Sequence, residues 1–209
     1  MVTIASCKGE HKGGNEEGII EFDTEAMDKN HPLYGFAPSE ATLKFKKEKF
    51  IIEMSAMGMF NTSIIGNCKT KTMTQAVRFL NINQACTENE KDIVASNNDY
   101  PIKIEETEET KDILGFKCYK ARVTKTNEPS VSFDVWYTKD LGMEDCNALT
   151  PYAQLKGIML DYRIKKMGIE MRFKATSYSN TEIPNKVFEI PSDAKIISKD
   201  EMAEFFNSL

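Results

Sequence analysis

Hydrophobic and polar side chains alternate along most of this chain with a period of two. Successive side chains of a β-strand point to opposite faces, so the alternation predicts strands that are apolar on one face. Residues 131–138 show it most clearly, because Val131, Phe133, Val135 and Tyr137 occupy every second position. The pattern therefore predicts a mainly β protein.

Short turns separate the alternating segments, and this spacing predicts antiparallel pairs of strands. The expected strands lie at residues 20–23, 41–46, 50–54, 63–67, 70–80, 102–106, 115–126, 131–138, 157–165 and 169–178. No helix recurs between consecutive strands, as it would in a parallel sheet. We therefore expect a single curved antiparallel sheet.

The alternation breaks in four stretches. Residues 81–98 mix short strand patterns with polar turns, and residues 141–155 have no period and predict a loop. The acidic run at residues 105–109 predicts a solvated turn. Residues 187–190 lie between two prolines and predict a short edge strand, because proline is tolerated at strand edges and ends.

The chain ends on a predicted helix. Ser198 is followed three residues later by Glu201, which is the spacing of a capping box. Met202, Phe205 and Phe206 then recur at helical spacing. We expect this C-terminal helix to pack against the sheet.

Composition and charge narrow the class of protein. The chain has 209 residues, of which 41% are hydrophobic and 28% charged, as in ordinary globular domains. The net charge of −5, with lysines interleaved among acids, argues against binding to nucleic acid. No stretch approaches the roughly 20 apolar residues of a membrane-spanning helix. We divide the chain into a start and tether at residues 1–17 and one β-rich domain at residues 18–209.

The first residues carry a short motif. Ile4-Ala5-Ser6-Cys7 resembles the bacterial lipobox, in which a peptidase cuts before a cysteine that then carries lipid. A glycine-rich polar stretch follows, as expected of a flexible tether. A signal peptide also needs a basic region and an apolar region before the cleavage motif. Here only Met1 to Ile4 precede Ala5-Ser6-Cys7. Either Cys7 is a lipid anchor that holds the protein on a membrane surface, or the segment is an ordinary frayed terminus.

The remaining cysteines leave two alternatives open. Without Cys7 the chain has four: Cys68, Cys86, Cys118 and Cys146. In an oxidising compartment they would form two disulfides. Otherwise they are small, buried, unpaired side chains. No C-x-x-C pair is present, which disfavours a structural zinc site.

Catalytic motifs are missing from the sequence. The two histidines, His11 and His31, lie near no nucleophile or carboxylate motif, so a triad has no base. The phosphate-binding, dinucleotide-binding, nucleophile-elbow and calcium-loop patterns do not occur. We expect no catalytic residues, no metal and no cofactor, and hence a protein that is not an enzyme.

Several segments resemble a known family. Residues 113–121 (ILGFKCYKA), 135–140 (VWYTKD), 155–162 (LKGIMLDY) and 187–191 (VFEIP) are similar to signatures of GLPGLI-like bacterial envelope lipoproteins, a domain family of unknown function. These families are in turn similar to proteins with the LolA/LolB-like fold. The resemblance implies an unclosed antiparallel half-barrel with a concave apolar face and a location in the Gram-negative envelope, in the periplasm or at the outer membrane. It supplies no catalytic residues.

The concave face is where we expect a ligand. Eleven methionines favour an adaptable apolar surface, because the thioether side chain is flexible and polarisable. Candidates to line an apolar groove for a lipid or another apolar ligand are Phe45, Ile52, Met54, Phe133, Val135, Met171 and Phe173. The alternative is a structural or adaptor module that binds another envelope protein through a sheet edge or the terminal helix.

Overall fold

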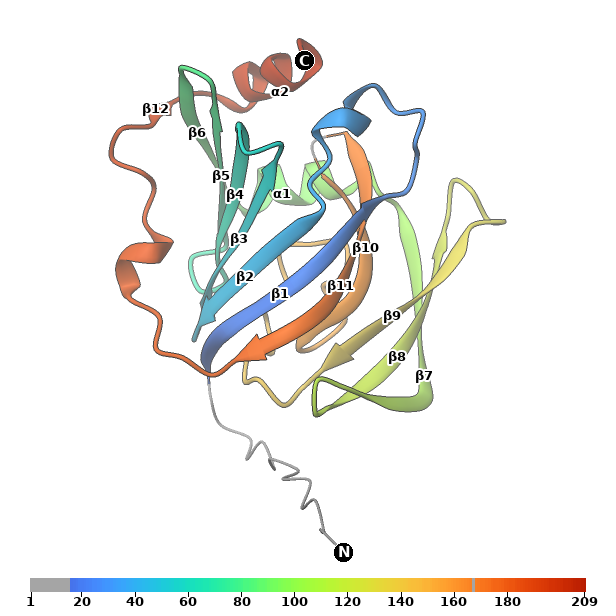
Figure 1. Cartoon of the computed structure of the whole chain (residues 1–209). Coiled ribbons are helices and arrows are strands. Elements are labelled where there is room, and N and C mark those ends of the chain that lie inside the picture. Colours follow the sequence, from blue (N-terminus) through green and yellow to red (C-terminus); the bar gives the residue numbers. More distant parts are fainter. Residues whose placement is uncertain (1–15, 167) are drawn as a thin grey trace, which may run out of the picture.

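The computed structural model describes residues 16–166 and 168–209. Over these residues the chain forms one 12-stranded sheet, in the order β12-β6-β5-β4-β3-β2-β1-β11-β10-β9-β8-β7. Neighbouring strands are antiparallel, except that β12 and β6 are parallel. The sheet curls but does not close (Figure 1), which confirms the predicted fold class: 51% strand, 13% helix and a C-terminal helix.

The elements follow the predicted segments closely. The strands are β1 Glu17–Ala26, β2 Glu40–Lys46, β3 Lys49–Ala56, β4 Phe60–Asn67, β5 Thr72–Phe79, β6 Ile82–Glu88, β7 Ile102–Ile113, β8 Phe116–Lys125, β9 Ser132–Thr138, β10 Ile158–Lys166, β11 Ile169–Ser179 and β12 Lys195–Ile196. The α-helices are α1 Glu90–Asn97 and α2 Lys199–Asn207, and the 3₁₀ helices are η1 Pro32–Phe36 and η2 Asn185–Phe188.

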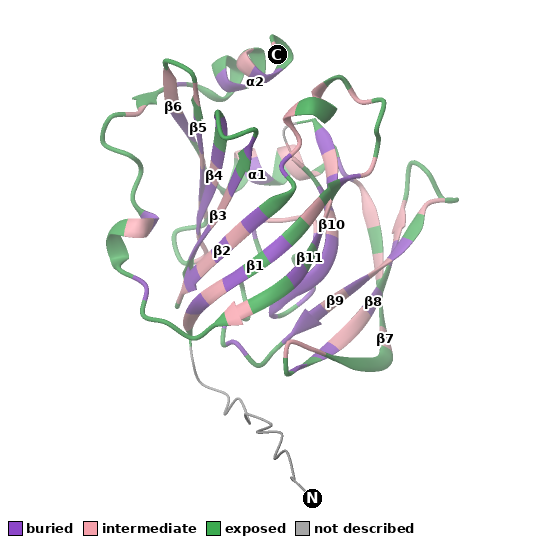
Figure 2. Cartoon of the chain, viewed as in Figure 1, coloured by how far each residue is buried: buried purple, intermediate pink, exposed green. Residues whose placement is uncertain are grey.

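The main core lies on the concave face of the sheet. Buried and more exposed residues alternate along β1 and β2 (Figure 2), as the period of two requires. The segment between β9 and β10 crosses this face as far as β7, where the amide of Gln154 donates to the carbonyl of Ile104. Three side chains of this segment, Leu149, Tyr152 and Leu155, are buried. This half of the concave face is therefore filled by the chain itself.

Two smaller clusters lie outside the main core. Ile51 and Ile65 point to the outer face of β3 and β4, where Ile183 and Phe188 from the chain around η2 cover them. At one end of the sheet, Met202 of α2 packs in a cluster with residues of β3 to β6. The helix thus uses its apolar stripe for packing, and its predicted capping box is present.

Three local predictions were wrong. Residues 90–97 form α1, capped by the side chain of Asn89, where we expected short strands and turns. The acidic run at residues 105–109 lies within β7, at a bulge rather than a turn. Residues 185–188 form a 3₁₀ helix that buries Phe188, where we expected an edge strand.

Candidate functional site

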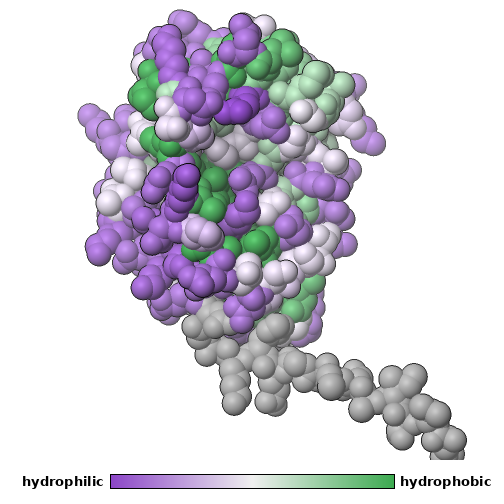
Figure 3. Space-filling model, turned by 60° about the vertical axis from the view of Figure 1, so that its left-hand side comes forward, coloured by the Kyte–Doolittle hydropathy of each residue, from purple (hydrophilic) through white to green (hydrophobic). Residues whose placement is uncertain are grey.

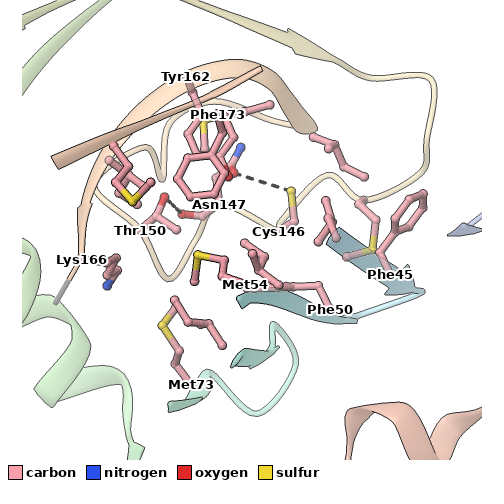
Figure 4. Close-up of a pocket in the computed structure, with 18 of the residues that line it drawn as sticks. Phe45, Phe50, Met54, Met73, Cys146, Asn147, Thr150, Tyr162, Lys166 and Phe173 are labelled. Carbon is pink, nitrogen blue, oxygen red and sulfur yellow. Dashed lines mark hydrogen bonds between the residues drawn. The ribbon is translucent and has the colours of Figure 1, made fainter. Parts of the chain in front are cut away.

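An apolar cavity of about 90 Å³ lies between the concave faces of β2–β5 and of β10–β11 (Figure 4). The segment between β9 and β10 forms the third wall. The lining residues are Leu43, Phe45, Phe50, Ile52, Met54, Ile64, Met73, Met143, Cys146, Asn147, Thr150, Ile158, Met159, Tyr162, Ile164, Lys166, Ile169, Met171 and Phe173. Most of them are carbon-rich side chains, so the cavity favours an apolar guest.

Five methionines line the cavity: Met54, Met73, Met143, Met159 and Met171. Their unbranched side chains can change rotamer without moving the backbone. Ligand pockets usually enclose roughly 300–1,000 Å³, so the present volume fits only a small group. A longer ligand requires the methionines to rotate, and their flexibility makes that rotation inexpensive.

Most polar groups of the third wall are occupied within it. The amide nitrogen of Asn147 donates to the carbonyl oxygens of Leu155 (2.8 Å) and Gly157 (2.7 Å). The thiol of Cys146 donates to the Gly157 carbonyl at 3.1 Å, and the Thr150 hydroxyl donates to the Asn147 carbonyl at 2.9 Å. These bonds hold the wall in place and leave little polarity for a guest.

Tyr162 and Lys166 differ from the rest of the lining. Within residues 16–166 and 168–209, neither the Tyr162 hydroxyl nor the Lys166 ammonium group has a hydrogen-bond or ion-pair partner. Tyr162 is 6% exposed and its ring stacks on Phe173 with centroids 5.0 Å apart. Burial raises the pKa of Tyr162 and lowers that of Lys166, because the interior disfavours the charged form of each.

The structure brings most of the predicted groove residues together. Phe45, Ile52, Met54, Met171 and Phe173 line the cavity. The other two predicted residues do not. Phe133 is buried with the Arg163 guanidinium 4.8 Å above its ring, and Val135 is fully buried on the same strand. Both lie on β9, in the half of the concave face that the chain fills itself.

Sequence reasoning missed Lys166, Tyr162, Met73 and Met143. A signal for the first two is present in the alternation, since residues 162, 164 and 166 share one face of β10. Met143 lies in a segment without periodicity, which gives no indication of the direction of its side chain.

The four cysteines outside the tether are free thiols in the structure. Burial raises the pKa of Cys68 to about 11 and that of Cys118 to about 12. Cys146 is shifted in the same direction by the same cause. These raised pKa values keep the unpaired thiols protonated in the structure, and disulfide formation in an oxidising compartment stays a prediction. Cys7 and His11 lie outside the described residues.

Other chemistry is sparse in the described part of the chain. His31 is the N-cap of η1, and its Nδ1 accepts a hydrogen bond from the backbone N–H of Leu33. Between residues 16 and 209, Met167 apart, no group of three or more histidine, cysteine or carboxylate side chains could hold a metal ion. Over the same residues, the helices are too short or too polar to cross a membrane.

The outer surface is mixed in character. On the face that carries β6 and the chain around η2, Figure 3 shows small hydrophobic areas separated by hydrophilic side chains. Charged pairs also follow the outer face of β8–β11, such as the bidentate pair of Arg172 and Asp161, whose two N–O distances are 2.9 Å. This pair joins neighbouring strands and satisfies the buried carboxylate of Asp161.

Comparisons with known proteins point to one family. Residues 25–164 match the family model described as N-glycanase peptide, N-terminal domain. A solved structure, "Structure of PNGF-II in C2 space group", aligns with 91% of this chain at 16% identity and a TM-score of 0.55. At this identity the likeness shows a shared fold. The chain spans only 32% of that longer chain.

Among curated proteins no sequence matches this chain. The resemblance to LolA/LolB-like envelope lipoproteins is addressed by neither similarity and stays a prediction. The family model, in contrast, covers more than half of the chain. The chain therefore belongs to the family of N-glycanase peptide N-terminal domains.

Proposed function

We propose that this domain binds an apolar ligand in the methionine-lined cavity and performs no catalysis itself. The observation that carries the proposal is a partly open cavity of about 90 Å³ lined by flexible apolar side chains on a concave sheet. Native cores are packed with few gaps larger than a water molecule, so a partly open apolar cavity of this size calls for an explanation. A guest that fills it when bound supplies one.

The cavity suits binding better than reaction. The thiol of Cys146 donates a hydrogen bond to the Gly157 carbonyl, and burial raises its pKa. A nucleophile needs an adjacent base or a lowered pKa, and Cys146 has neither among the described residues. The role of this side chain is to hold the wall between β9 and β10.

A matched pair of substitutions tests the proposal. Ile64 and Ile65 are neighbours on β4, each 8% exposed, but Ile64 lines the cavity and Ile65 faces the outer cluster. We expect Ile64→Phe to fill the cavity and abolish binding of an apolar fluorescent probe, while Ile65→Phe leaves binding intact. Thermal unfolding of both variants controls for folding. Equal binding by the two variants would contradict the proposal.

Native mass spectrometry after mild extraction supplies an independent test. The protein purified from its own source should carry a co-purified apolar molecule, which is released on denaturation. A mass equal to that of the bare chain, together with failure of added apolar probes to bind, would refute ligand binding.

The same proposal includes a location. A lipid on Cys7 would hold the domain at a membrane of the Gram-negative envelope, as the lipobox-like motif favours. The test is the intact mass of the mature protein, compared with that of a Cys7→Ser variant. An unmodified cysteine and an unchanged membrane fraction for the variant would count against the anchor.

A second candidate function is an adaptor module. Two observations favour it. The family is described as an N-terminal domain, and this chain aligns with only 32% of the longer PNGF-II chain, as a module of a larger protein would. The free edge strand β7 is the longest strand and offers a pairing surface. A purified envelope protein should then bind the chain and lose affinity when Glu108→Pro disrupts that edge. Affinity unchanged by the substitution would remove β7 as the docking edge.

A further inference from the structure

The cavity has a charged end that indicates the chemical class of its ligand. Resting on the ligand binding proposed above, we propose that the ligand is an anionic amphiphile whose carboxylate pairs with Lys166 while its apolar chain lies among the methionines.

Lys166 ends an apolar row on the concave face. Tyr162, Ile164 and Lys166 occupy alternate positions of β10, opposite Phe173, Met171 and Ile169 of β11. All six line the cavity. Figure 4 shows Lys166 at the left-hand side of the cavity, with Phe45 and Cys146 toward the other side. A ligand inside the cavity would therefore have an ammonium group at one end only.

Other lysines with little exposure have a carboxylate partner. The side chains of Lys125, Lys120 and Lys46 are 14%, 15% and 21% exposed, and each lies within 3 Å of a glutamate oxygen. Lys166 is buried enough to lower its pKa, yet it pairs with no described residue. Lys166 is half-buried, and a partly desolvated charge without a partner is unfavourable, so the fold leaves a site that a ligand's negative charge would satisfy.

The charged groups nearest to Lys166 do not balance its positive charge. The acid that acts on it is Glu88 of β6, and the neighbouring cation is Lys199 of α2. The Glu88 carboxylate already accepts from Ser96 at 3.1 Å and lies 3.3 Å from the Lys199 ammonium. Lys199 thus already pairs with this carboxylate, and no described carboxylate pairs with Lys166. An incoming carboxylate would balance the positive charge of Lys166.

The depth of the site sets the expected length of the ligand. The hydroxyl of Tyr162, unpartnered among the described residues, belongs to a side chain that is more buried than Lys166. The Cα atoms of Tyr162 and Lys166 are four residues apart along β10, or roughly 13 Å at about 3.3 Å per residue. A chain of medium length reaches this far, provided that the methionines rotate to admit it.

The test compares three probes that share a ten-carbon chain: decanoate, decanol and decyltrimethylammonium. Each is titrated by calorimetry into the wild-type chain at neutral pH. Decanoate should bind at least tenfold more tightly than decanol, and the cationic probe should bind more weakly than either. A charged hydrogen bond of ordinary strength accounts for a difference of this size.

Two lysine substitutions locate the charge. Lys166→Met should lower decanoate affinity at least tenfold and leave decanol affinity unchanged or improved. Lys166→Arg should retain much of the preference for decanoate. Lys165→Met is the matched control, because Lys165 is the next residue on the strand and is exposed on the opposite face. It should leave all three affinities unchanged.

The outcomes separate the two proposals. Decanol and decanoate binding equally, or Lys166→Met and Lys165→Met behaving alike, would overturn the role of Lys166 and leave apolar binding standing. Failure of all three probes to bind would overturn both. Decyl phosphate, added as a fourth probe with the same ten-carbon chain, distinguishes a lipid phosphate from a free carboxylic acid as the source of the anion, and tighter binding of the phosphate would refute the carboxylate assignment.

Discussion

Gly66 determines the position of an aromatic ring that lines the cavity. Gly66 of β4 pairs directly with Phe50 of β3. A Cβ atom added to the glycine would lie 2.2 Å from two carbons of the Phe50 ring. Ordinary contacts begin at 3.4 Å, so Gly66→Ala requires the ring to move by about 1 Å. The ring is 6% exposed and has little room to do so.

The magnitude follows from this crowding. Overpacking a well-packed core costs typically 1–3 kcal/mol. For a domain of this size, each kcal/mol lowers the melting temperature by roughly 2–4 °C. Gly66→Ala should therefore lower the melting temperature by about 3–10 °C. It should also weaken binding of an apolar probe, because the displaced ring borders the cavity.

A double-mutant cycle isolates the contact. Phe50→Leu removes the ring and is destabilising by itself, but in that background the added methyl group has space. Gly66→Ala should then cost less than about 0.5 kcal/mol, measured by urea denaturation of all four proteins. If the substitution costs the same in both backgrounds, the ring contact is not the reason why glycine lies here.

Three further perturbations have defined outcomes. Gly157→Ala should destabilise by about 3 kcal/mol or more, measured by urea denaturation, because φ is +123° and the new Cβ would lie 2.0 Å from the backbone oxygen of Thr138; normal stability would contradict the described path of the chain. Arg172→Met should cost about 2 kcal/mol in the same assay, because the buried Asp161 carboxylate loses its bidentate partner. The loss is smaller than for a fully buried pair, since solvent screens the half-exposed arginine. An unchanged free energy of unfolding would show that water replaces the arginine as the partner of Asp161. Burial raises the pKa of Tyr162, so the unfolded chain loses the phenol proton at a lower pH than the folded chain. The free energy of unfolding should therefore fall as the pH rises above about 10. Tyr162→Phe should make this decline shallower, measured by unfolding curves from pH 8 to 11.

The alternation predicted the strands because one-sided burial has a period of two. It failed where other contacts decide the conformation. Helix α1 is short and buries only Ile93, so its amphipathic pattern is faint. The segment around η2 coils to place Phe188 over Ile51 and Ile65. Adjacent isoleucines on β3 and β4 signal strands buried on both faces, and this observation could have predicted a covering segment.

The site was predictable where it is built from regular strands. Phe45, Ile52 and Met54 followed from the apolar face of the expected hairpin, and the structure places them in the cavity wall. The third wall comes from a segment without periodicity, whose course depends on the bonds between Asn147 and the carbonyls that follow it. Lys166 escaped notice because a lysine at the end of a strand usually faces solvent.

The cavity and Lys166 together make a prediction about stability that does not depend on the ligand's identity. A closed, unfilled apolar cavity costs roughly 24 cal/mol per Å³, so about 2 kcal/mol is the upper bound for this partly open cavity of about 90 Å³. The unpartnered, partly buried ammonium group adds to that cost. If this part of the fold were optimised for stability alone, both would have been replaced.

We therefore expect Ile64→Phe and Lys166→Met each to raise the free energy of unfolding of the ligand-free chain while lowering ligand binding. Such opposition is the signature of a site whose function is maintained at the expense of stability. Urea denaturation with and without decanoate measures both quantities on the same samples. If both substitutions destabilise the ligand-free chain, the cavity and the lysine belong to the packing of the fold, and the basis for a ligand is lost.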